Sequence, residues 1–73
     1  MEYTQIKNSI DRQREFIKME LDFIESRQNR LAAEMAANDL NFEMIESQRR
    51  QIINSVSEIK RYADKIEKIM GQI

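Results

Sequence analysis

The stretch Asn38-Asp39-Leu40-Asn41, in the middle of the 73-residue chain, decides between the folds that the rest of the sequence allows. Three of its four residues carry short polar side chains that hydrogen-bond to nearby backbone, and such residues favour caps and turns over helix interiors. Asn38 can adopt the left-handed conformation that ends a helix, and Asp39 or Asn41 can cap the next one. We therefore predict a turn at about residues 38–41.

The sequence on both sides of this stretch is typical of long helices. There is no proline, and the single glycine is Gly71, so nothing interrupts a helix before the last three residues. Apolar residues recur three, four and seven positions apart, and no segment alternates with the period of a strand. We predict one all-α domain, with helices at about residues 3–37 and 42–71. Because the linker is short, they should form an antiparallel two-helix hairpin of the coiled-coil type.

Every seventh residue from Tyr3 belongs to one heptad column, and ten of its eleven members are apolar. This regularity predicts the seam between the two helices. The heptad column four residues further on is less regular, and it is weak near the N-terminus, where it holds Lys7 and Arg14. The predicted seam residues are Ile10, Ile17, Ile24, Leu31, Ile45, Ile52, Ile59 and Ile66.

A continuous helix is the alternative to the hairpin. The Tyr3 column runs through the predicted turn without a change of phase, and Asn38 lies on it. A single helix of about 105 Å, with Asn38 as a polar register residue inside a coiled coil, would explain this phase. The hairpin instead predicts two helices of about 45–50 Å each.

The apolar surface is larger than one neighbouring helix can cover. In residues 16–24 the apolar side chains spread over about 200° of the helix circumference. Such a surplus indicates an oligomer core or a partner site, so we expect a helical protein partner, a second copy in a four-helix bundle, or both. The predicted partner-interface residues are Phe16, Met19, Phe23, Ile53, Tyr62 and Ile69.

The composition argues against a catalytic or metal-binding role. The chain contains neither cysteine nor histidine, which removes disulfides and the usual zinc ligands, and no glycine-rich loop precedes Gly71. We expect no catalysis, no metal or cofactor and no small-molecule substrate. Twelve basic and thirteen acidic residues give a net charge of −1, which predicts no nucleic-acid partner. No apolar run reaches the ~20 residues of a membrane span, and the N-terminus lacks the features of a signal peptide, so we predict a cytoplasmic protein.

Charged residues are unevenly distributed near the predicted turn. Residues 31–48 contain four acidic residues and no basic one, so the turn end of a hairpin would be acidic. Just outside this stretch lie Arg27, Arg30, Arg49 and Arg50. We interpret them as solvated charges that pair with neighbouring glutamates, and the spacing of Glu46 and Arg50 favours an ion pair on one helix face.

The two near-equal helices, the turn at residues 38–41 and the surplus apolar surface together resemble the small E-type co-chaperones of bacterial type III secretion systems. The resemblance covers the whole chain and is one of shape. It implies that the chain joins a second, TPR-like chaperone in the cytoplasm and helps to keep a needle subunit from polymerising. The apolar stripe would then cover part of that chaperone. Two other functions fit the same pattern: a homo-oligomeric coiled coil that tethers or spaces other proteins, and a small regulatory inhibitor or phage-encoded adaptor.

Overall fold

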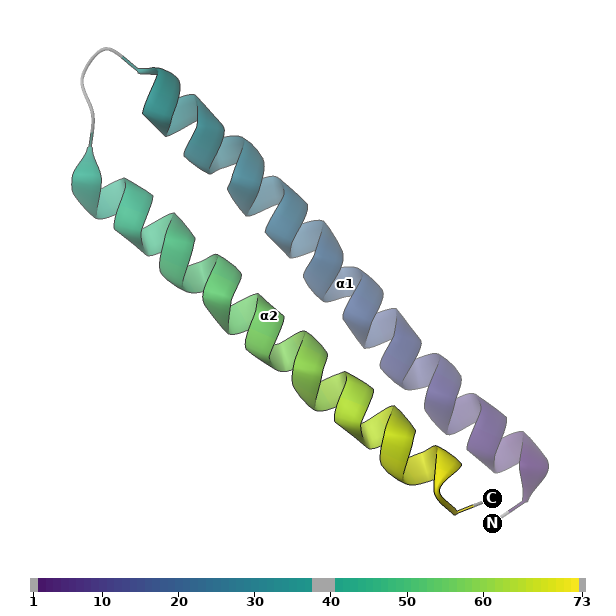
Figure 1. The fold of residues 1–73 in the computed structure, drawn as a ribbon. Helices are drawn as coiled ribbons and strands as arrows, with labels where there is room; N and C mark the ends of the chain where they lie inside the picture. Colours follow the sequence, from purple (N-terminus) through teal and green to yellow (C-terminus); the bar gives the residue numbers. More distant parts are fainter. Residues whose placement is uncertain (1, 38–40, 73) are drawn as a thin grey trace.

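The protein folds as two long helices that lie side by side. A computed structural model describes residues 2–37 and 41–72, with α1 at Tyr3–Ala36 and α2 at Phe42–Met70. The helices run in opposite directions, and both termini lie at the same end (Figure 1). The molecule extends 57 Å along its longest axis, which excludes the continuous helix of about 105 Å. The predicted all-α hairpin is confirmed.

The residues around the turn show how the helices end and begin. Ala37 has extended backbone angles (φ −70°, ψ 143°), so α1 stops at Ala36. Asn41 precedes α2, and its side-chain Oδ1 accepts a hydrogen bond from the backbone N–H of Met44 at 3.2 Å. Asn41 is therefore the N-cap of α2, one of the two predicted capping residues. The predicted roles of Asn38 and Asp39 fall on residues 38–40, which lie outside the described residues.

The register of the hairpin can be followed from one aromatic contact in the half nearer the termini. The rings of Phe16 and Tyr62 lie with their centroids 5.2 Å apart. Because the helices are antiparallel, each step forward along α1 matches one step back along α2. Phe23 accordingly lines the same hollow as Ser55.

The interface between the helices follows a regular three-four spacing. All eight predicted seam residues are half-buried along it. The second column of the interface lies three residues after the first, and its described members that are buried or half-buried are Ile6, Gln13, Glu20, Arg27, Glu34, Gln48, Ser55, Tyr62 and Ile69.

The column four residues after the first is therefore not part of the interface. Its large apolar members are 53–73% exposed: Leu21, Met35, Phe42, Val56 and Met70. Near the termini this column would bring Lys7 and Arg14 between the helices, and burying unpaired charges is costly. The alternative column offers Ile6, Tyr62 and Ile69 in the same region, so the helices pack through it.

The hairpin buries no described side chain completely. Among the described residues, Ile6 is the only buried apolar residue, at 8% exposure, and Gln48 is the only buried polar one, at 3%. Two helices in contact along one side leave the remaining apolar surface open to solvent. The large open surface therefore follows from the fold.

Candidate protein-interaction surfaces

One apolar surface lies on the side of the seam marked by Phe16 and Phe23, each of which directly precedes a seam isoleucine. We call Phe16, Met19, Phe23 and Tyr62 the aromatic face. Phe16 is 38% exposed and packs on Tyr62 with the ring planes tilted by 34°. An aromatic pair in this geometry contributes about 0.5–1.5 kcal/mol beyond the area that it buries. The pair thus joins the two helices while leaving part of the Phe16 ring accessible.

Two cations lie near the Tyr62 ring. The Arg61 guanidinium carbon is 5.3 Å from the ring centroid, and the Lys65 ammonium is 6.0 Å from it. Arg61 also donates a hydrogen bond to Glu58, which raises the pKa of the guanidinium above its ordinary value. The aromatic face is therefore bordered by positive charge on α2.

Shallow hollows lie on both sides of the Phe23 ring. One, of about 370 Å³, is lined by Met19, Asp22, Phe23 and Ser26 on the outer side of α1. The other, of about 280 Å³, lies toward α2 and is lined by Phe23, polar residues and three charged residues, Glu20, Arg27 and Glu58. Phe23 is a ridge between these hollows, and the alternation suits the side chains of an approaching helix.

The predicted partner-interface residues are divided among three places. Phe16, Met19 and Phe23 are exposed together on α1, as the helical spacing predicted. The structure places Tyr62 and Ile69 in the seam, where both are half-buried, instead of beside it. Ile53 is exposed on the other side of the hairpin, one helical turn from Val56.

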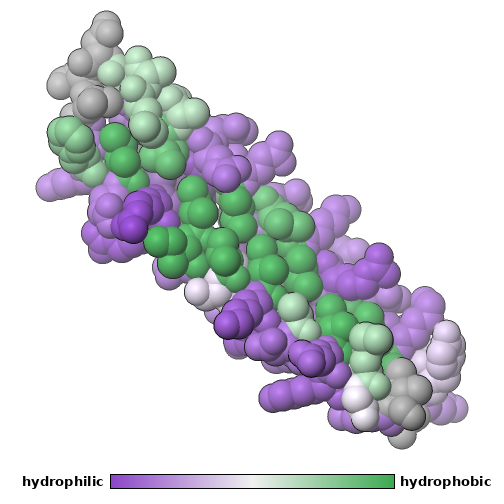
Figure 2. Space-filling model, viewed as in Figure 1, coloured by the Kyte–Doolittle hydropathy of each residue, from purple (hydrophilic) through white to green (hydrophobic). Residues whose placement is uncertain are grey.

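A second apolar surface was not singled out from the sequence. We call Leu21, Met35, Phe42, Val56 and Met70 the open column. In an antiparallel pair, equivalent heptad positions outside the seam lie on the same side, so α1 and α2 both contribute to it. A band of apolar side chains runs along the length of the hairpin on the face shown in Figure 2. The sequence feature that could have indicated this surface is the presence of Lys7 and Arg14 in the same heptad column. A column with two cations is disfavoured in the seam between two helices.

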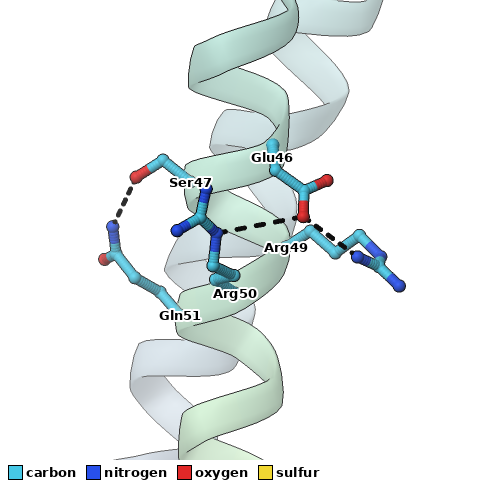
Figure 3. A network of polar contacts seen from close by, with 5 residues as sticks. All are labelled: Glu46, Ser47, Arg49, Arg50 and Gln51. Atoms are coloured by element: carbon cyan, nitrogen blue, oxygen red, sulfur yellow. Dashed lines mark hydrogen bonds and ion pairs between the residues drawn. The ribbon is translucent and has the colours of Figure 1, made fainter.

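Polar contacts near the turn stay within one helix. Glu46 accepts a hydrogen bond from Arg49 at 3.1 Å and pairs with the Nε of Arg50 at 3.9 Å, while Gln51 donates to Ser47 at 3.1 Å (Figure 3). The expected Glu46–Arg50 ion pair is present. These side chains are largely exposed, so each pair contributes little to stability.

The seam itself contains polar atoms without hydrogen-bond partners. The Oε1 atoms of Gln13 and Gln48 are buried and accept no hydrogen bond from the residues that the structure describes. An unpaired buried amide destabilises the fold, so the pair of helices is held less firmly than an all-apolar seam would allow.

Within residues 2–37 and 41–72, no three histidine, cysteine, aspartate or glutamate residues are grouped so that they could hold a metal ion. Over the same ranges, neither helix is long and apolar enough to cross a membrane. No family model, curated protein or solved structure matches this chain.

Proposed function

We propose that this chain is a non-catalytic protein-interaction module that covers an apolar helical surface of another protein. The supporting observation is the distribution of apolar side chains. Eleven large apolar residues are exposed in the described part of the chain, against one that is buried. Completely burying an exposed side chain of this kind contributes about 1.5–3 kcal/mol, and these side chains are already partly covered. A partner that covers several of them would still be bound and would stabilise the hairpin.

The aromatic face is the surface that we assign to this partner. Phe16, Met19 and Phe23 follow one another at spacings of three and four, so they form a ridge along α1. Aromatic residues and methionine are enriched at the centres of protein interfaces. The hollows beside Phe23 would receive side chains of a partner helix laid along this ridge.

The resemblance to secretion co-chaperones gives the proposal a more specific form. In that form the chain acts in the cytoplasm and binds the TPR-like chaperone of a type III needle subunit. The regulatory-inhibitor alternative would use the same face, with a helix groove on its target as the counterpart. Both forms predict that the partner raises the melting temperature of this chain.

The experiment combines the purified chain with a type III needle subunit and its TPR-like chaperone. Light scattering follows polymerisation of the needle subunit, and circular dichroism follows the melting of this chain. We expect slower polymerisation and a higher melting temperature with the wild-type chain, and neither effect with Phe16→Ser/Phe23→Ser. Leu21→Ser on the open column is the matched control: whatever its own melting temperature, it should still slow polymerisation and should melt higher with the partner than without it.

Two results would contradict the proposal. If neither protein changes the melting of the chain, the secretion form is wrong. If the chain alone is monomeric and melts above about 65 °C, it needs no partner, and the broader proposal fails as well.

A further inference from the structure

We propose that the open column binds a second copy of this chain. The two hairpins lie face to face and head to tail, so that the turn of each covers the termini of the other, and they form an antiparallel four-helix bundle. This inference goes beyond the proposed function because it uses the opposite side of the hairpin and leaves the aromatic face free.

The open column has its apolar centre halfway along the molecule. Val56 lies fourteen residues from each end of α2, and the register that pairs Phe16 with Tyr62 brings Leu21 of α1 close to it. On both sides of these residues the half-buried seam isoleucines reach the surface between the helices. A second hairpin on this face would complete their burial.

The dimensions of the face match those of a second hairpin. The Cα atoms span 57 Å along the molecule and 14 Å across it. A single docked helix would cover only part of this width, whereas a second hairpin matches both dimensions.

The charge distribution selects the head-to-tail orientation. At the turn end, the described residues between 31 and 48 include Glu34, Glu43 and Glu46 and no lysine or arginine. At the opposite end, residues 2–18 and 60–72 contain eight basic and five acidic residues. Head-to-tail packing places the acidic end of each copy on the basic end of the other. Head-to-head packing would place like charges together, at an electrostatic cost.

A two-fold axis at the level of Leu21 and Val56 also gives compatible neighbours within the column. On α1, Arg14 and Gln28 are each seven residues from Leu21, so Arg14 of one copy lies over Gln28 of the other. Lys7 lies over Met35 in the same way, and its aliphatic stem can cover that side chain.

The same axis gives compatible neighbours on α2. Arg49 and Ala63 are each seven residues from Val56, and Phe42 and Met70 are each fourteen from it. The arginine of one copy therefore lies over the alanine of the other, where its aliphatic stem can pack while the guanidinium stays in solvent at the edge. The phenylalanine lies over the methionine. No two like charges oppose each other along the heptad column that contains the open column.

The edge of the interface provides a reciprocal ion pair. Lys18 precedes Leu21 by three residues, and Glu25 follows it by four, both on the outer flank of the open column. The head-to-tail axis brings Lys18 of each copy near Glu25 of the other. In the head-to-head arrangement, Lys18 would instead lie near Lys60.

Single-cysteine variants test this geometry directly because the chain has no cysteine of its own. We expect Leu21→Cys to form a disulfide-linked dimer with itself under mild oxidation. An equal mixture of Lys7→Cys and Met35→Cys should give the mixed dimer, which mass spectrometry identifies. Head-to-head packing would instead favour the mixed dimer of Met35→Cys and Phe42→Cys, and that result would overturn the orientation.

Sedimentation equilibrium provides the second readout and its controls. The wild-type chain should sediment at twice its 8.8 kDa mass in the micromolar range. Leu21→Asp/Val56→Asp should raise the dissociation constant more than ~100-fold, because it places charges at the centre of an apolar interface. Phe16→Ser/Phe23→Ser should remain dimeric.

One control variant and three possible results complete the test of the dimer. Met19→Cys lies away from the open column and should not cross-link. A wild-type monomer up to millimolar concentration, a particle larger than a dimer, or cross-linking through Met19→Cys in place of Leu21→Cys would each overturn the inference. None of these results depends on the secretion partner, so failure here is distinguishable from failure of the proposed function.

Discussion

Replacing Gln48 by leucine should make the protein more stable, although the change removes a polar side chain from a largely polar column. Gln48 is 3% exposed, and its Oε1 accepts no hydrogen bond from the described residues. A buried polar group without a partner costs about 1–3 kcal/mol, and leucine has a similar size without that cost. The register places this position near Leu31, so the new side chain would meet an apolar neighbour.

The expected gain is therefore about 1–3 kcal/mol in the free energy of unfolding, or about 5–20 °C in melting temperature for a chain of this length. Urea and thermal denaturation followed by circular dichroism, at one fixed protein concentration, would measure it. Gln5→Leu is the matched control, because Gln5 is exposed on α1 and its replacement should change stability by less than about 0.5 kcal/mol. A Gln48→Leu variant that is no more stable than the wild type would refute the assignment of an unpaired amide.

Three further changes address the cap, the aromatic pair and the surface charges. Asn41→Ala removes the side-chain acceptor for the Met44 N–H and should cost about 1 kcal/mol in urea denaturation, whereas an unchanged midpoint would mean that the cap is not formed in solution. A double-mutant cycle of Phe16→Leu and Tyr62→Leu should give a coupling free energy of about 0.5–1.5 kcal/mol; independent effects would indicate that the rings do not pack. Glu46→Gln should lower the free energy of unfolding by less than about 1 kcal/mol, because the partners of Glu46 are exposed arginines, and the difference should shrink at high salt. A larger loss that does not depend on salt would contradict the assignment of Glu46 to a solvated ion pair.

The two proposals together assign a different contact to each apolar surface. In the proposed arrangement, a second copy occupies the open column, and the aromatic faces of the dimer remain accessible on opposite outer sides. A partner helix would then bind to each hairpin without competing with dimer formation. Variants at Leu21 and at Phe23 should therefore separate self-association from partner binding.

Much of the candidate interaction surface was predictable from α1 alone. Phe16, Met19 and Phe23 flank the seam isoleucines at helical spacings, so their exposure in a hairpin follows from periodicity. The position of Tyr62 could not be predicted in the same way. Its column has apolar residues only near the termini, and in the middle it contains residues such as Glu20 and Arg27, which a seam rarely includes.

The sequence by itself determined the helices, the break between Ala36 and Phe42 and the first column of the seam. These features depend on local backbone preferences and on a repeat that each helix carries alone. Only the tertiary structure decided which second column joins the seam and which becomes the open column. That choice depends on how far both helices rotate about their axes. The rotation reflects all the side chains along the interface at once, including the cost of bringing Lys7 and Arg14 between the helices.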